Sequence, residues 1–242
     1  GYIMEKGADP DGYLTPDAAS YADLYALCHT MAEAARKGQP DIVVRASSSL
    51  PRALSGIADK PFVTPQELMS GGGTGCFVVG SHVKKTTEQL NRLLAADGVG
   101  GIELPVEDIL NDPQRLMSDT TDTIRRMAAQ GVTPVIYTSR TELRTDDAAE
   151  RQALGKRVSD FLVETVRQLP CHPKYLVAKG GITSHDILTH GLNVGMARVM
   201  GQVINSVPCI MAEKDGSPLP YIIFPGNVGT KDSLKEIYDI LG

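Results

Sequence analysis

Residues 76–242 alternate between short apolar runs and longer segments with helical spacing, and this alternation limits the fold more than any other feature of the chain. The apolar runs are rich in β-branched residues and read CFVV, TPVIYT, YLVAK and YIIF. Continuous apolar runs of this kind are typical of strands that are buried on both faces and joined by crossover helices. The pattern predicts the α/β class, with a mostly parallel sheet covered by helices on both faces in a Rossmann-like, three-layer arrangement.

The amino-terminal part of the chain lacks this regular alternation. Thr15 precedes Pro16, which is the arrangement of a helix cap followed by proline at the first helical position. We therefore expect a helix from this point to about Lys37. The β-branched run DIVVRAS at residues 41–47 predicts a strand, and the LPRALSGI run after it predicts a brief helical piece.

Residues 61–75 separate the two parts. This segment carries Pro61 and Pro65, and four of its last five residues are glycine. Proline and glycine at this density are typical of linkers and irregular loops. We therefore expect a first part at residues 1–60, a linker or mobile loop at 61–75 and a main domain at 76–242.

The chain is mildly acidic, with 24 Lys and Arg against 29 Asp and Glu and a formal net charge of −5. No basic tract is present, which argues against nucleic acid as the main ligand but leaves a small phosphate ligand open. No run of about 18 apolar residues occurs, as a membrane span would need, and the first residues do not resemble a signal peptide. The four cysteines are widely spaced, as expected for reduced thiols. These features together predict a cytoplasmic protein.

Three junctions between a predicted strand and the following segment carry small residues: FVVGSHVKKT, LVAKGGITSHD and IIFPGNVGTKD. In open α/β sheets, ligands bind outside the carboxyl ends of the strands, where such junctions lie. Small residues let the backbone approach a ligand, and free N–H groups at a helix start favour phosphate. No GxxxxGK[ST] loop is present, and GGGTG precedes a strand instead of following one, so neither a P-loop nor a dinucleotide fingerprint is indicated. The junctions predict a binding site for a phosphate-containing ligand.

Each polar side chain at these junctions has a structural and a functional interpretation. Ser81 is expected either to cap the following helix or to donate its hydroxyl to a phosphate. Thr183 and Ser184 are expected to cap a helix that starts at His185, to contact a nucleotide, or to do both. Lys179 either neutralises phosphate charge or is solvated at a strand end.

Further cations flank the junctions. Lys84 and Lys85 follow the first junction and are expected to form a solvated helix face or to contact phosphate. Arg140 and Arg144 follow the TPVIYTS strand and are candidates for binding an anion.

The combination of VGSHVKKTTEQL, VIYTSR, LVAKGGITSHDIL and YIIFPGNVG closely resembles the carboxyl-terminal nucleotide-binding domain of the four-carbon acid sugar kinases. This family, long catalogued as of unknown function, phosphorylates threonate, erythronate or related tetronates with ATP. The resemblance covers roughly Gly75 to Gly242. It implies the cofactors ATP and Mg²⁺, and it implies ATP contacts at Ser81, Gly181, Ile182, Thr183, Ser184 and Gly226. It assigns no catalytic residue and no metal ligand.

One part of the family pattern is missing. The kinases begin with a substrate domain that carries an ADDLTGA-type motif, and no such motif occurs here. Residues 1–60 resemble only the tail of that substrate-binding domain, so we expect a truncated chain that is inactive alone. The leading hypothesis is the ATP-binding part of a kinase acting on a hydroxyl of a four-carbon sugar acid. The alternative is a non-catalytic nucleotide- or anion-responsive module of effector type. An exposed interdomain face would favour a homodimer in either case.

Overall fold

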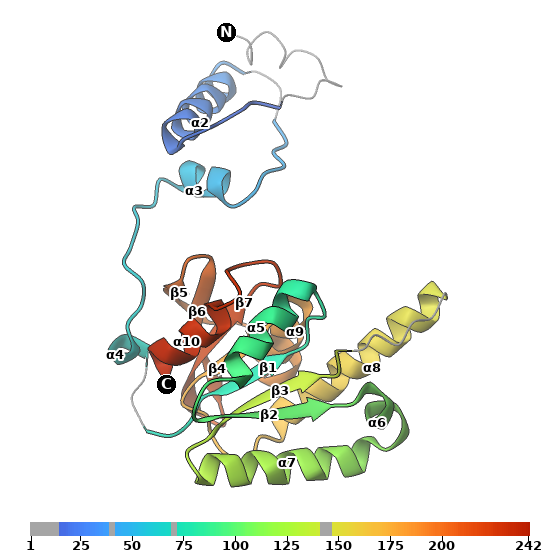
Figure 1. The fold of residues 1–242 in the computed structure, drawn as a ribbon. Coiled ribbons are helices and arrows are strands. Elements are labelled where there is room, and N and C mark those ends of the chain that lie inside the picture. Colours follow the sequence, from blue (N-terminus) through green and yellow to red (C-terminus); the bar gives the residue numbers. More distant parts are fainter. Residues whose placement is uncertain (1–14, 39–41, 69–71, 141–146) are drawn as a thin grey trace. The chain divides into compact units, whose positions relative to one another are not determined.

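The computed structural model describes residues 15–38, 42–68, 72–140 and 147–242, and the chain divides into two compact units, Gly1–Lys60 and Pro61–Gly242. Figure 1 shows the elements of each unit. In the first unit, the described residues form helices α2 (Tyr21–Arg36) and α3 (Ser49–Ser55).

Helix α2 begins later than the sequence predicts. Its N-cap is Ser20, whose hydroxyl accepts a hydrogen bond from the Asp23 N–H, while the Asp23 carboxylate accepts one from the Ser20 N–H at 2.9 Å. This reciprocal capping box satisfies two N–H groups of the helix end at once. The cap expected at Thr15 is therefore wrong, although the helix ends close to Lys37, its C-cap, as expected.

The strand expected at residues 41–47 is also wrong for residues 42–47, the part that the structure describes. These residues have no regular secondary structure, and the Val43 side chain is 96% exposed. A strand needs a neighbouring strand to pair with its backbone. The described residues of the first unit contain no other strand, so the local β-propensity has no partner to act on.

The second unit is built on a seven-stranded sheet with the order β2-β3-β1-β4-β7-β6-β5. The pairings from β2 through β7 are parallel, and the pairs β7–β6 and β6–β5 are antiparallel. The predicted mostly parallel sheet is confirmed. The strands are β1 (Cys76–Val79), β2 (Val99–Leu104), β3 (Thr133–Thr138), β4 (Leu176–Lys179), β5 (Arg198–Ile204), β6 (Val207–Lys214) and β7 (Ser217–Phe224).

Helices cover both faces of this sheet, which confirms the three-layer α/β fold. The helical elements are α4 (Pro65–Leu68), α5 (Lys84–Leu94), α6 (Val106–Asn111), α7 (Pro113–Ala129), α8 (Ala148–Arg167), α9 (Gly181–Asp186), the π-helical turn η1 (Ile187–Gly191) and α10 (Ser233–Leu241). No helix among the described residues is long and apolar enough to cross a membrane.

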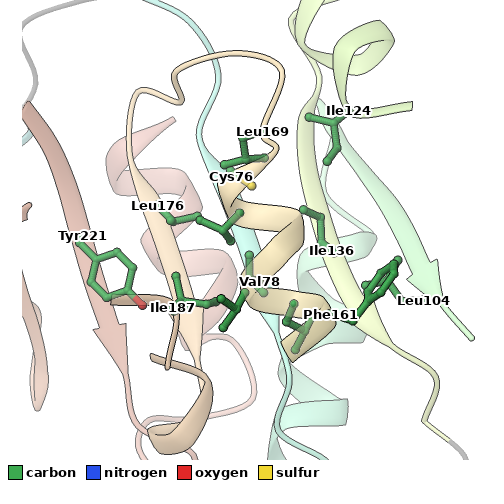
Figure 2. Close-up of a cluster of buried hydrophobic side chains, with 14 of the residues drawn as sticks. Cys76, Val78, Leu104, Ile124, Ile136, Phe161, Leu169, Leu176, Ile187 and Tyr221 are labelled. Atoms are coloured by element: carbon green, nitrogen blue, oxygen red, sulfur yellow. The ribbon is translucent and has the colours of Figure 1, made fainter. Parts of the chain in front are cut away.

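Alternating strand residues supply the two cores. On one face, Val78 and Leu176 from adjacent strands pack with Phe161 of α8 (Figure 2). On the other face, Phe77 packs in a cluster with residues of α5 and α10, such as Leu90. Burial on both faces explains why the parallel strands are continuous apolar runs in the sequence.

The segment expected as a linker differs from that expectation in its described first half. The Val63 N–H donates a 2.9 Å hydrogen bond to the Gln202 carbonyl on the edge strand β5, and the Val63 and Leu68 side chains are buried in the α5–α10 core. Residues 61–68 therefore pack on the sheet of the second unit. Buried apolar side chains at these two positions outweigh the irregularity that Pro61 and Pro65 predict.

Candidate functional site

The turns after β1, β4 and β7 meet at one edge of the sheet. These strands are adjacent and parallel, so their carboxyl ends lie together. Backbone hydrogen bonds join the turns directly: the Gly180 N–H donates to the Phe224 carbonyl at 2.9 Å, and the Gly80 N–H donates to the Lys179 carbonyl at 3.3 Å. The structure thus brings together the three glycine-containing junctions singled out in the sequence.

Two of the glycines at this edge are required by the fold. A Cβ atom on Gly80 would lie 2.3 Å from the Thr183 hydroxyl oxygen, which is closer than atoms can approach. Gly180 has a φ of +126° and would place a Cβ atom 3.1 Å from the same oxygen. Residues other than glycine rarely adopt such a backbone conformation. Close packing and backbone geometry therefore explain Gly80 and Gly180 without any ligand.

Two other glycines are not required by the fold. A Cβ atom on Gly181 would meet nothing within 4 Å, and one on Gly226 would meet only the Ser81 hydroxyl oxygen, at 3.6 Å. Neither residue has a positive φ. The space beside Gly181 and Gly226 lies where a ligand would approach the carboxyl ends of the strands. Both glycines belong to the residues that the family resemblance implies for ATP.

Ser81 does not cap α5. The N-cap is Val83, which provides no side-chain hydrogen bond, so the capping interpretation of Ser81 is wrong. The Ser81 hydroxyl accepts a 3.2 Å hydrogen bond from the Thr86 hydroxyl and is only partly buried. With Gly226 beside it, this hydroxyl lies between the first and third turns.

The second turn is also organised differently from the expectation. Helix α9 begins at Gly181 with Gly180 as N-cap, so neither Thr183 nor Ser184 caps a helix that starts at His185. The buried Ser184 hydroxyl is directed at two backbone carbonyls, those of Gly180 at 2.6 Å and Ala178 at 2.8 Å. Ser184 thereby fixes the turn to the end of β4.

Thr183 and Ile182 lie in the same turn with very different exposure. The Thr183 hydroxyl fills the space above Gly80 and Gly180, and the residue is only 8% exposed. The Ile182 side chain is 76% exposed, which is unusual for a large apolar residue. The turn therefore presents one hydroxyl near the glycines and one apolar side chain to the outside.

Lys179 is buried, not solvated. Its ammonium group donates hydrogen bonds to the Pro225 carbonyl at 2.7 Å and to the Gly226 carbonyl at 3.2 Å, and it lies 3.9 Å from the centre of the Phe224 ring. Burial lowers the pKa of Lys179 to about 8, and the positive charge of Lys85 adds to this shift. The Lys179 side chain thus contacts the backbone of the third turn.

Side chains of α5 hold the loop that follows β7. The Lys85 ammonium donates to the Asn227 carbonyl at 3.1 Å, and the buried Gln89 amide donates to the Val228 and Thr230 carbonyls at 3.1 and 2.7 Å. Lys85 therefore has a structural partner in addition to its position near the site. Sequence reasoning missed Gln89, although its spacing of four residues from Lys85 places both on one helix face.

Arg140 connects the turn after β1 to α5. Its guanidinium donates to the Ser81 carbonyl at 2.6 Å and to the Thr87 hydroxyl at 2.9 Å, while its Nη1 atom is buried and has no partner among the described residues. Burial lowers the pKa of Arg140, and Glu103 opposes that shift. Arg144 lies outside the described residues.

The charged groups that these contacts bring to the edge are cations. Lys85, Lys179 and Arg140 all donate to atoms of the turns or of the loop after β7. Within the described ranges, no group of three or more His, Cys, Asp or Glu side chains is placed to hold a metal ion. Open glycines, the partly exposed Ser81 hydroxyl and excess positive charge together suit an anionic ligand with phosphate groups.

The fold and this edge define the class of an α/β nucleotide-binding domain. Residues 76–234 match the family described as the nucleotide-binding C-terminal domain. Because the match covers more than half of the chain, the chain belongs to this family, and the family predicted from the sequence motifs is confirmed. No curated protein sequence matches the chain.

Solved structures share the fold. A Haemophilus influenzae protein of the DUF1537 family gives a TM-score of 0.65 at 17% identity, over 93% of this chain and 53% of that protein. A Salmonella typhimurium protein gives 0.61 at 14% identity, over 90% of this chain and 50% of that protein. A Bordetella bronchiseptica DUF1537 protein, a domain-swapped dimer with bound citrate, gives a TM-score of 0.53 at 17% identity, over 93% of this chain and 52% of that protein. The chain thus spans about half the length of these relatives.

Proposed function

We propose that the second unit binds ATP at the carboxyl ends of β1, β4 and β7, and that it serves as the nucleotide-binding part of a kinase for a four-carbon sugar acid of the threonate or erythronate type. The observation that carries the proposal is the pair of glycines, Gly181 and Gly226, that neither backbone geometry nor packing requires. Membership of a nucleotide-binding family supports the ligand class. The motifs that resemble the sugar acid kinases support the reaction.

In the proposed complex, the backbone at Gly181 and Gly226 approaches the phosphates, and the hydroxyls of Ser81 and Thr183 donate to phosphate oxygens. Ile182, exposed on the same turn, offers an apolar contact. Ser184 acts by fixing the turn, because its hydroxyl is already directed at two carbonyls. This division of roles follows from which atoms are open and which are already bonded.

A bound Mg²⁺ would supply neutralisation of the phosphate charge. Magnesium ions at such sites keep several waters and take phosphate oxygens with one or two carboxylates. The chain's own contribution is to position ATP and to balance its charge through Lys85, Lys179 and Arg140.

The acceptor site is proposed to lie mainly outside the second unit. The solved relatives are about twice as long as the matched region. In sequence, residues 1–60 resemble the tail of the substrate domain of the sugar acid kinases. Transfer requires the acceptor hydroxyl to be held near the terminal phosphate. In well-oriented intramolecular reactions, such positioning lowers the activation barrier by about 7–11 kcal/mol. Pairing of two copies is part of the proposal, since the Bordetella relative is a domain-swapped dimer.

Titration calorimetry with ATP, ADP and inorganic phosphate tests the ligand class. We expect ATP and ADP to bind with Mg²⁺ present and phosphate alone to bind far more weakly. A coupled assay for ADP release with threonate and erythronate, with and without the missing part of a full-length relative, tests the reaction. Nucleotide binding without turnover in any combination would instead favour the non-catalytic module, and absence of nucleotide binding would contradict the proposal.

A further inference from the structure

Lys179 joins two of the three turns through a single ammonium group. Its backbone ends β4 and leads into the Gly180–Ser184 turn, and its side chain is fully buried and donates to the carbonyls of Pro225 and Gly226 in the third turn. The backbone that would approach the nucleotide at Gly226 is therefore held in place by the strand that carries the second turn.

This buried ammonium has no carboxylate partner among the described residues. The ion pairs of the described chain do not include Lys179, and its neighbours are two carbonyls and the face of the Phe224 ring. In the sheet, Lys179 lies between Val79 of β1 and Phe224 of β7, and its ammonium group contacts β7 and the loop that follows. The titratable group whose charge acts on Lys179 is Lys85 of α5, another cation. Carbonyl dipoles offset only part of the cost of burying a charge.

We propose that Lys179 is a positioning residue whose charge is balanced by the ligand: it fixes the Gly226 turn, and the bound nucleotide phosphates supply the counter-charge that the described protein residues do not. The inference rests on the proposed nucleotide binding. It also predicts that the site prefers phosphorylated ligands. A neutral nucleoside would not balance the charge of the Lys179 ammonium group and would gain no affinity from it.

Nucleotide binding should be coupled to the protonation of Lys179. In the free protein the pKa of Lys179 is about 8, so the amine is partly deprotonated above that pH. Phosphates nearby favour the charged form and raise this pKa on binding. Nucleotide binding above pH 8 therefore takes up a proton from the buffer, and affinity falls as the pH rises further. The phosphate groups do not contribute, since their second pKa is about 6.

Calorimetry of ADP binding to the whole chain, in two buffers of different ionisation enthalpy near pH 8.5, measures this uptake. We expect several tenths of a proton taken up per ADP by the wild type. We expect none for Lys179→Met, together with affinity at least tenfold weaker near pH 7, and none for Lys179→Arg, whose charge is permanent. Lys174→Met, two residues before β4, is the control for loss of a lysine charge and should behave as the wild type.

The outcomes separate the two claims. Wild-type binding without proton uptake overturns the role of Lys179 while leaving nucleotide binding intact, whether or not the variants fold. Undiminished uptake in a folded Lys179→Met protein overturns it as well. Failure of the wild type to bind ADP contradicts the proposed function, and the inference falls with it.

Discussion

The turn after β4 and the loop after β7 form two sides of the same site but are stabilised in different ways. The β4 turn is held by its own residues: Gly180 supplies the backbone conformation and Ser184 bonds back to the strand. The β7 loop is held from outside, by Gln89 of α5 and by Lys179. Substitutions of Gly180 and Ser184, which hold the first turn, should therefore act mainly on stability, and substitutions in the second region should act mainly on ligand binding.

The largest effect on stability is expected from Gly180→Ala. The φ of +126° and a Cβ contact of 3.1 Å with the Thr183 hydroxyl both oppose a side chain there. We expect the free energy of unfolding to fall by about 2 kcal/mol or more. Chemical denaturation measures the change. Gly181→Ala, the next residue along the chain, is the control and should change stability by less than about 0.5 kcal/mol. Equal losses for both variants would contradict the comparison.

Ser184→Ala should have a smaller effect. The substitution removes a buried hydroxyl that lies within hydrogen-bond distance of the Gly180 and Ala178 carbonyls and donates to one of them at a time. The expected loss is about 1 kcal/mol, the usual value for one such hydrogen bond. Thermal unfolding measures this loss, and ADP affinity of the folded variant should stay within about threefold of the wild type. A large loss of affinity with unchanged stability would assign Ser184 a direct nucleotide contact.

Lys85→Met should have the smallest effect on stability. Its hydrogen bond to the Asn227 carbonyl is exposed, so the free energy of unfolding should change by less than about 0.5 kcal/mol. Removal of a cation near the phosphates should nevertheless weaken ADP binding by a factor of about 3–10, an effect that decreases at high salt. Lys235→Met on α10 is the control. Salt-independent or unchanged affinity would separate Lys85 from the site.

The sequence alone predicts the sheet well and the details of the turns less well. The apolar runs around Val78 and Val177 are long enough to show burial on both faces, so the parallel strands follow from local pattern. The run at 42–47 has the same local propensity but no partner strand among the described residues of its unit. Pairing is a property of distant segments, and local composition does not reveal it.

At the candidate site, too, the sequence predicts local features better than contacts between distant segments. The glycines at 181 and 226 mark, in the sequence, the turns that are proposed to face the ligand. The burial of Lys179 depends on β7 lying next to β4, which is a non-local feature of strand order. Ser81 resembles a helix cap because it precedes a helical pattern, yet the helix starts only after Val83. Gln89 lacks any motif and is identified only by its contacts with the β7 loop.

Nucleotide affinity of Gly226→Val tests the central claim most directly. A Cβ atom at this position meets only the Ser81 hydroxyl oxygen, at 3.6 Å, so we expect the variant to fold with a melting temperature close to that of the wild type. Gly195→Val is the matched control, because Gly195 is an exposed loop glycine where an added Cβ atom meets nothing within 4 Å. Calorimetry should show ADP affinity reduced at least tenfold, about 1.4 kcal/mol, in Gly226→Val and unchanged in the control. Wild-type affinity in a folded Gly226→Val protein would contradict the placement of the nucleotide at the carboxyl ends of β1, β4 and β7.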